Sequence, residues 1–280
     1  MKIRVWGSRG SIPTPGPATT HYGGNTTCVE VRLNDGKLIV FDAGSGIRLL
    51  GKKLAAESET KELHLVLTHA HWDHLIGFPF FEPAYMARFT INVRGGPSAK
   101  RSLRGYLAHQ MKTPFFPVPF DTMTANFDFA HGDPKVRSIG HADLIPIRLS
   151  HPNNCHGFKV IEGNKQFVFF TDHELGHKHV KALDTDAYMD FCRDADFLFQ
   201  DAQYTGHEYV KTRGWGHSSI TDAVAFGIKA NVKKLGLFHH DPDRSDDELA
   251  DLEATLREQL RSVDTKMDCF AVREGMTLQL

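Results

Sequence analysis

The sequence predicts an α/β fold, and two observations carry this prediction. The first part of the chain holds short runs of β-type residues, at 2–6, 27–33, 38–41 and 63–67. In the later part, strand-like runs alternate with amphipathic segments of helical period. Strands that give way to alternating strands and helices are typical of an α/β domain.

The early elements are set by turn and helix signals. Asn34-Asp35-Gly36 separates two β-type runs and predicts a hairpin between 27–33 and 38–41. Asp42-Ala43-Gly44-Ser45-Gly46 then leads into a predicted helix at 47–56. The apolar strand at 63–67 ends at Thr68.

The segment 78–129 differs from its surroundings because proline and phenylalanine are dense in it. Proline at this density excludes long regular elements. We therefore expect an irregular insertion, which either packs on the core or forms a lid or substrate wall.

The second half supplies the alternating elements. A Ser245-x-x-Glu248 capping box begins a strongly amphipathic helix. No repeat or linker interrupts the pattern, so we expect one domain over residues 1–280. Strands are predicted at 144–149, 157–161, 166–171, 196–200, 235–238 and 266–272, and helices at 178–193, 219–230 and 245–261.

Composition excludes several classes of protein. Lys plus Arg (33) against Asp plus Glu (34) gives a net charge of −1, which disfavours a generic nucleic-acid binder. No apolar run is long enough to span a membrane, and the first residues do not resemble a signal peptide. The four cysteines lie far apart, which favours a reducing, cytoplasmic setting. Seventeen histidines in 280 residues make metal binding the feature to look for.

The strongest local signal is Thr68-His69-Ala70-His71-Trp72-Asp73-His74, directly after the strand at 63–67. In extended chain, His69 and His71 point the same way and would grip one ion together. If the chain then turns, Asp73 and His74 would hold a second ion. Further candidates follow predicted strands, where α/β sites are usually built: His151, Asp172 and His239, with His240 as the alternative to His239.

The chain resembles the metallo-β-lactamase superfamily, whose His-x-His-x-Asp-His motif stands at residues 69–74. The resemblance implies a four-layer αβ/βα sandwich with two divalent metal ions at one edge. Zinc suits the mixed shell best, with manganese or iron as alternatives. Asp42 would orient the metal-binding loop. One metal would be held by His69, His71 and His151 and the other by Asp73, His74 and His239, with Asp172 bridging.

Gly216-His217-Ser218-Ser219 and Asp201 resemble the ribonuclease Z and cyclic phosphodiesterase branch, with Ser219 in place of a threonine. The resemblance implies that His217, supported by Asp201, serves the leaving group, and with Asp73 these are the candidate catalytic residues. Packing or capping is the alternative role for His217, and a structural salt bridge is an equal alternative for Asp201. Arg9 and Asn25 are substrate contacts or structural turn residues.

We therefore expect a hydrolase that cleaves a small or cyclic nucleotide-type phosphodiester with a hydroxide held between two metals. The alternatives are a lactam, lactone or thioester hydrolase and an RNA-processing nuclease. The charge and the lack of a long flexible insertion argue against a long nucleic acid. The branch often dimerises, so the resemblance suggests a homodimer.

Overall fold

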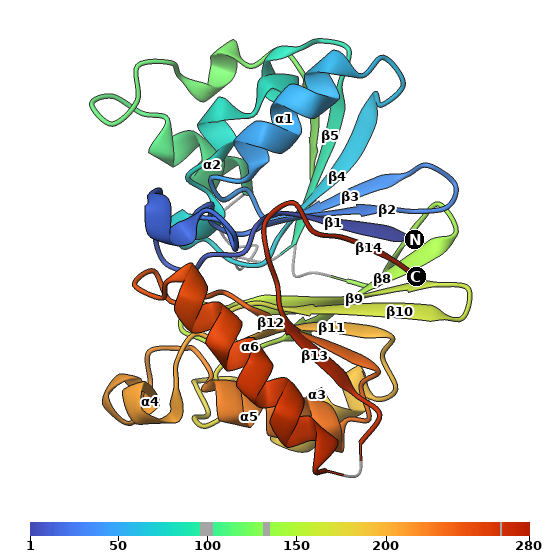
Figure 1. Ribbon diagram of the computed structural model, residues 1–280. Coiled ribbons are helices and arrows are strands. Elements are labelled where there is room, and N and C mark those ends of the chain that lie inside the picture. Colours follow the sequence, from blue (N-terminus) through green and yellow to red (C-terminus); the bar gives the residue numbers. More distant parts are fainter. Residues whose placement is uncertain (96–102, 131–134, 264) are drawn as a thin grey trace.

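The computed structural model describes residues 1–95, 103–130, 135–263 and 265–280. Within these ranges two mixed sheets of seven strands each pack face to face, with helices on both outer faces (Figure 1). This is the αβ/βα sandwich that the resemblance to the metallo-β-lactamase superfamily implies. That the whole chain is one domain stays a prediction.

The first sheet has the order β14-β1-β2-β3-β4-β5-β6. The predicted hairpin is present, and β3 and β4 run parallel, so both lead toward the same edge. Leucines of α1 (Ile47–Ala56) and α2 (Leu103–Gln110) are buried against this sheet. Its strands are β14 (Thr277–Gln279), β1 (Lys2–Gly7), β2 (Cys28–Arg32), β3 (Leu38–Phe41), β4 (Glu62–Leu67), β5 (Thr90–Gly95) and β6 (Asn126–Phe129).

The second sheet has the order β13-β12-β11-β10-β9-β8-β7, with β10 to β13 parallel. Its outer face is covered by α3 (Thr185–Cys192), α5 (Ile220–Lys229) and α6 (Asp246–Arg261) (Figure 1). The short α4 (Gly206–Thr212) lies between β11 and α5 along the chain. The strands are β7 (Arg137–Ile139), β8 (Ala142–Arg148), β9 (His156–Glu162), β10 (Lys165–Phe170), β11 (Phe197–Asp201), β12 (Lys234–Phe238) and β13 (Asp268–Ala271).

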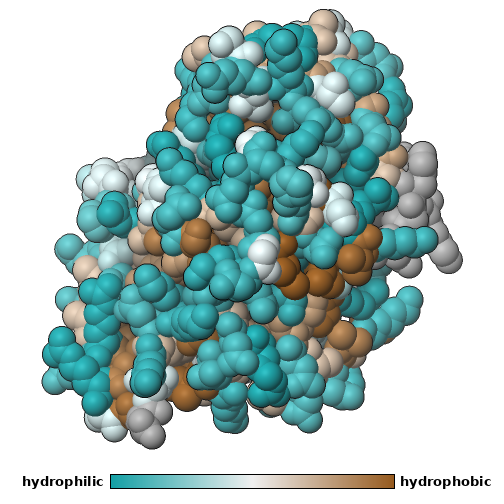
Figure 2. Space-filling model, turned by 90° about the vertical axis from the view of Figure 1, so that its right-hand side faces the viewer, coloured by the Kyte–Doolittle hydropathy of each residue, from teal (hydrophilic) through white to brown (hydrophobic). Residues whose placement is uncertain are grey.

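Phenylalanine dominates the core between the sheets. Phe41 from the first sheet packs on Phe158 and Phe169 from the second, with ring centroids 5.7 and 5.1 Å apart. On the face that carries both termini, Met276, Leu278 and other partly buried residues border this core. Figure 2 shows hydrophobic side chains gathered in a band there, between hydrophilic surroundings.

Three sequence predictions need correction. The segment 78–129 is not wholly irregular, because β5, α2 and β6 lie between its prolines; residues 96–102 of it lie outside the described ranges. The helix predicted at 178–193 is only α3, because the Ser150 hydroxyl bonds the backbone of His177 and His179 and holds that stretch as a loop. The chain also does not close at 266–272: β14 follows and pairs with β1.

The insertion packs mainly on the core. Phe78, Phe81 and Phe89 are fully buried, whereas Phe80 and Phe115 are exposed. Whether it also forms a lid or substrate wall stays a prediction. Short 3-10 turns lie at Pro17–Thr19, Trp72–His74, Phe78–Phe80, Glu82–Tyr85 and Phe120–Thr122.

Among the described residues, the longest helix is α6, and no helix combines the length and apolarity that a membrane span requires.

Candidate metal centre

The candidate ligands gather where parallel strands end. Asp42 follows β3, Asp172 lies two residues after β10, and His239 follows β12. These three residues have left-handed φ values of 59°, 47° and 61°. A non-glycine residue in this region costs about 1–3 kcal/mol and is concentrated at functional sites. The backbone thus turns sharply at each strand end that carries a candidate residue.

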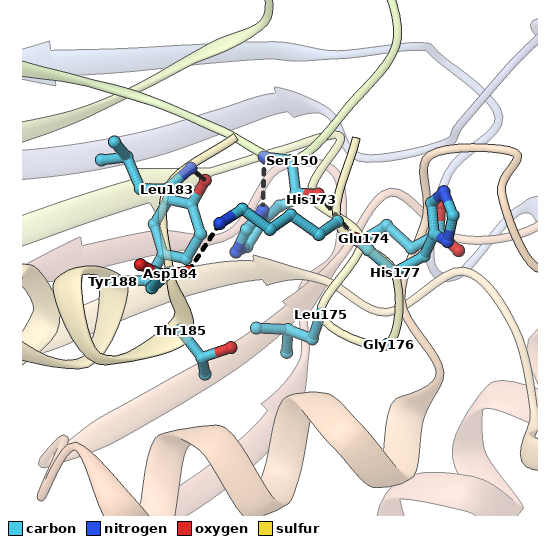
Figure 3. A pocket seen from close by; sticks show the side chains of 11 residues that line it. Ser150, His173, Glu174, Leu175, Gly176, His177, Leu183, Asp184, Thr185 and Tyr188 are labelled. Carbon is cyan, nitrogen blue, oxygen red and sulfur yellow. Dashed lines mark hydrogen bonds and ion pairs between the residues drawn. The ribbon is translucent and has the colours of Figure 1, made fainter. Parts of the chain in front are cut away.

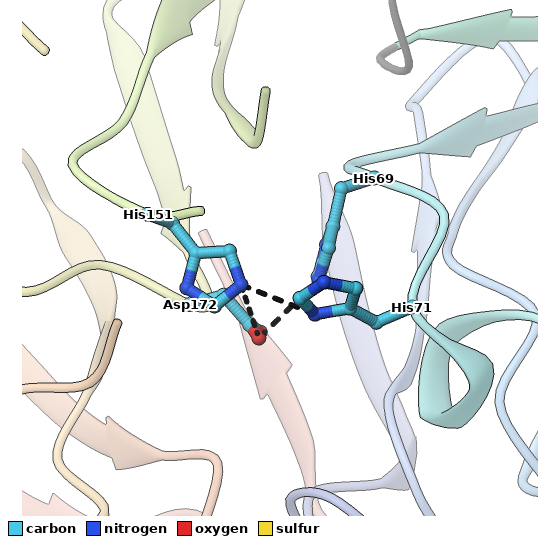
Figure 4. A group of neighbouring side chains, drawn as sticks. All are labelled: His69, His71, His151 and Asp172. Atoms are coloured by element: carbon cyan, nitrogen blue, oxygen red, sulfur yellow. Dashed lines mark hydrogen bonds and ion pairs between the residues drawn. The ribbon is translucent and has the colours of Figure 1, made fainter. Parts of the chain in front are cut away.

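The first group of ligand-type side chains joins both halves of the sandwich (Figure 4). His69 and His71 come from the loop after β4, His151 from the loop after β8, and Asp172 from the loop after β10. The Nε2 atom of His151 lies 3.2 Å from Nδ1 of His71, and His69 Nε2 lies 3.4 Å from Asp172 Oδ2. These four side chains offer one ligand atom each within 4.8 Å of one another.

The second group shares Asp172 with the first and adds Asp73, His74 and His239. The Nε2 atoms of His74 and His239 both lie 3.1 Å from Asp73 Oδ2. They lie 3.0 and 3.3 Å from Asp172 Oδ1. Asp172 therefore faces one group with each of its two oxygens.

Hydrogen bonds fix the tautomers of the first group. Nδ1 of His151 donates to the carbonyl of Gly216 at 2.8 Å, because a carbonyl only accepts. The Thr68 hydroxyl gives its hydrogen to Asp42 and so accepts from Nδ1 of His69. Both Nε2 atoms then carry lone pairs that face a carboxylate, and that of His69 is buried without a hydrogen-bond partner.

The second group shows a related arrangement, in which Nε2 of His239 also forms a hydrogen bond with Asp73 Oδ2 at 3.1 Å. Nδ1 of His74 donates to Asp42 at 2.8 Å, and Nδ1 of His239 donates to the side-chain oxygen of Gln203 at 3.1 Å. Although Nε2 of His74 lies near two carboxylates, it is not aligned for a hydrogen bond with either. Imidazole nitrogens and carboxylates that converge in a buried space favour a cation between them. The donor set therefore fits two divalent metal ions.

The charges of the bare side chains agree with this need. Burial raises the pKa of Asp172, but the imidazoles of His239, His74 and His69 outweigh it and hold that pKa well below its usual range. Burial lowers the pKa of His151 to about 3, so this imidazole is neutral and free to bind a metal.

His217 and Asp201 form a hydrogen-bonded pair beside both groups. Nδ1 of His217 lies 2.6 Å from Asp201 Oδ2, and its ring stacks on His239 with centroids 4.8 Å apart. Burial lowers the pKa of His217, but the charge and hydrogen bond of Asp201 outweigh it and raise the pKa to about 9. Asp201 also accepts from the backbone of Ser218, which anchors the turn to β11.

Glu174 is a supporting residue that the sequence analysis missed. This buried carboxylate accepts hydrogen bonds from the backbone of Gly214 and Gly216 at 2.6 and 2.8 Å, and from the Tyr209 hydroxyl and His179. It also lines a cavity of about 240 Å³, in which the backbone of Ser150 donates to His173 (Figure 3). Glu174 belongs to no periodic pattern, and only its place two residues after Asp172 hinted at a role.

Position 216 has to be glycine for two reasons: its φ is 102°, and its backbone lies close to His151. A Cβ atom there would lie 2.2 Å from Nδ1 of His151.

Other sequence candidates lie outside the two groups. His240, the alternative ligand, is buried and donates from Nε2 to the carbonyl of Val272 at 2.7 Å, and it belongs to neither group. Arg9 is fully buried and donates to the carbonyls of Gly23, Asp241 and Arg244. Asn25 bonds Glu274 and Ser45. Arg9 and Asn25 thus hold loops together.

Comparison with known proteins agrees with this geometry. Residues 37–240 match the Beta-lactamase superfamily domain. The chain is 24% identical to the ribonuclease Z of Pyrococcus horikoshii, over 86% of this chain and 87% of that protein. Among solved structures it is similar to the metallo-beta-lactamase fold protein YhfI of Bacillus subtilis (TM-score 0.70, 16% identity, 99% and 98% covered). It is also similar to the short form of human tRNase Z (TM-score 0.67, 18% identity, 100% and 99% covered).

Proposed function

The chain belongs to the metallo-β-lactamase superfamily of metal-dependent hydrolases, and from this premise we propose that it hydrolyses a small or cyclic nucleotide-type phosphodiester. The observation that carries the proposal is the His217–Asp201 pair beside the two ligand groups. A phosphodiester leaves as an alkoxide, which needs a proton or a positive donor. An imidazole held by a carboxylate supplies both.

We propose that His69, His71 and His151 hold one metal ion, that Asp73, His74 and His239 hold the other, and that Asp172 bridges them. The lone-pair directions set by the hydrogen bonds to Thr68, Asp42, Gly216 and Gln203 support this assignment. When bound, the two ions would supply a nucleophilic water and neutralise charge on the phosphoryl oxygens. The mixed nitrogen and carboxylate set favours zinc, although manganese and iron accept similar donors.

The side chains of this protein would then do the following work. Asp201 fixes the Nδ1 edge of His217, so that Nε2 is free to give its proton to the departing oxygen as the phosphorus–oxygen bond breaks. Asp42 holds both His74 and the backbone of Thr68, which keeps the loop after β4 in place. The hydroxyl of water ends on phosphorus and the proton of His217 on the alcohol product. The second proton of the water leaves to solvent, from which His217 is protonated again.

The test is hydrolysis of bis(p-nitrophenyl) phosphate by protein loaded with zinc or manganese, with and without EDTA. A chromogenic lactam and a thioester are tested in parallel. We expect EDTA-sensitive turnover of this diester by the wild type, and with a diester that has an alkyl leaving group we expect turnover to fall at least tenfold in His217→Ala. Turnover of only the lactam or the thioester would refute the phosphodiesterase proposal and make His217 a structural turn residue.

An RNA-processing nuclease is the second candidate, favoured by the relatives named ribonuclease Z. The net charge of −1 weighs against a long polyanionic substrate. A precursor tRNA assay beside the diester assay separates the two, since a processing nuclease would cleave the precursor much faster than a small diester. We also propose a cytoplasmic location, supported by four free, buried cysteines, and a homodimer, which rests on the family resemblance.

A further inference from the structure

A pocket of about 510 Å³ begins at His217 and extends to α4; we call it the α4 pocket. Two of its lining residues also hold candidate metal ligands. The backbone of Ser11 donates to Asp73 at 3.0 Å, and the side chain of Gln203 bonds His239. The α4 pocket therefore borders the candidate metal centre, and its volume lies within the roughly 300–1,000 Å³ of small-molecule sites.

The α4 pocket offers an aromatic face. Trp215, two residues before His217, is 64% exposed and lines the pocket with Pro242 and the nearly buried Tyr204. An indole presented in this way is a stacking platform for a nucleobase, and such stacking accepts any base because every base has a π-face.

The charges around the α4 pocket argue against further phosphates. Glu208 is neutralised by Arg244 at 2.6 Å. The charge of His217 is balanced by Asp201. Among the described residues, no salt bridge involves the remaining charged lining groups, which are the carboxylates of Asp241 and Asp243 and the ammonium of Lys211. Two carboxylates against one ammonium repel a second phosphate, whereas carboxylate oxygens accept hydrogen bonds from sugar hydroxyls.

We propose that the α4 pocket binds the nucleoside that carries the leaving oxygen, with its base on Trp215 and its sugar toward Asp241 and Asp243. This rests on the proposed phosphodiesterase function and narrows it. The substrate is a diester whose leaving side is a single nucleoside without further phosphates. Trp215 is then a specificity-determining residue, and His217 lies where the nucleoside oxygen meets phosphorus.

The test uses the zinc-loaded protein and adenosine as the probe. Adenosine binding is measured by calorimetry, and adenosine inhibition is measured against hydrolysis of bis(p-nitrophenyl) phosphate. Trp215→Ala is the test variant. Phe115→Ala is the matched control, because Phe115 is another exposed aromatic residue (72%) and does not line the α4 pocket.

We expect adenosine to bind and to inhibit competitively, with at least tenfold weaker binding in Trp215→Ala and unchanged binding in Phe115→Ala. Equal binding by wild type and Trp215→Ala, a loss confined to Phe115→Ala, or no adenosine binding at millimolar concentration would overturn the proposal. Calorimetry needs no turnover, so the two proposals fail separately. If the protein hydrolyses the diester but its binding of adenosine does not depend on Trp215, only the proposed nucleoside site is refuted. Trp215-dependent binding without hydrolysis would leave a nucleoside site, but it would refute the phosphodiesterase function and with it the role of that nucleoside as the leaving group.

Discussion

Glu174 accepts a hydrogen bond from the backbone nitrogen of Gly216 at 2.8 Å, and the carbonyl of Gly216 accepts one from His151 at 2.8 Å. One buried carboxylate thus fixes the turn that orients a candidate metal ligand. Because His217 is the next residue along the chain, the same turn also sets the position of the candidate proton donor. Metal binding and proton donation are therefore linked through the loop that follows β10.

Replacement of Glu174 by Gln tests this link. The amide nitrogen of glutamine would face a backbone or side-chain donor, so at least one buried hydrogen bond is lost. We expect a folded protein with a lower Tm and a 10- to 100-fold weaker affinity for zinc, as is typical when an orienting partner is removed. Zinc affinity is measured by chelator competition, with the exposed Glu59→Gln as the control. A lower Tm with unchanged zinc affinity would show that Glu174 only stabilises the fold.

Loss of the shared carboxylate should affect both proposed metals. In Asp172→Asn one of the two facing oxygens is replaced by a donor, so both groups lose charge or a ligand atom. We expect fewer than two metal ions per chain by elemental analysis and at least a 100-fold lower rate of diester hydrolysis. His141→Ala, an exposed histidine outside both groups, should keep the wild-type metal content. Two tightly bound ions in Asp172→Asn would contradict the bridging assignment.

Much of the fold was predictable because its signals are local. The turn at Asn34-Asp35-Gly36 and the capping box of Ser245 and Glu248 each act within a few residues, and both form as predicted. The insertion was harder to predict. Its prolines exclude long elements, but β5 and β6 are short enough to fit between them and gain their stability from pairing with each other and with β4.

In the candidate metal centre, too, some features follow from local sequence signals and others only from tertiary contacts. The spacing of residues 69–74 reveals a ligand cluster, because four ligand-type side chains lie within six positions. Asp and His are more common than most residues in the left-handed region, but residue type alone does not identify Asp172 and His239 as the positions that adopt it. The partners Gln203 and Glu174 reach the site only through tertiary contacts.

The hydrogen bonds of Asp246 lead to a prediction of how the free energy of unfolding depends on pH. It accepts hydrogen bonds from the backbone of His21 and Tyr22 at 2.6 and 2.9 Å. Burial raises the pKa of Asp246, but these bonds outweigh it and lower the pKa below the ordinary 3.8. A depressed pKa stabilises the fold above the unfolded-state pKa, and that contribution is lost as pH falls through the folded-state pKa.

We therefore expect Asp246→Asn to reduce the free energy of unfolding by about 1 kcal/mol at pH 7. This deficit should shrink as the pH falls below 3.8, because the wild-type carboxyl then becomes protonated and is neutral like the amide of the variant. Urea unfolding at several pH values measures this difference. The exposed Asp186→Asn is the control, and an Asp246→Asn deficit that is constant with pH would show that the ionised carboxylate is not what the backbone of His21 and Tyr22 requires.

His217 predicts how activity depends on pH. Asp201 raises the pKa of His217 to about 9 in the bare site, and bound divalent ions would lower it by repelling the imidazolium. The protonated donor is present below this pKa and is lost as pH rises through it. We expect kcat/KM for a diester with an alkyl leaving group to fall on an alkaline limb at or below pH 9.

The variant His217→Ala should hydrolyse this diester more slowly and lack that limb. A p-nitrophenyl diester should show a smaller effect of the substitution, because p-nitrophenolate departs without a proton. An alkaline limb that persists in His217→Ala would assign the proton to another group and leave Asp201 and His217 as a structural pair.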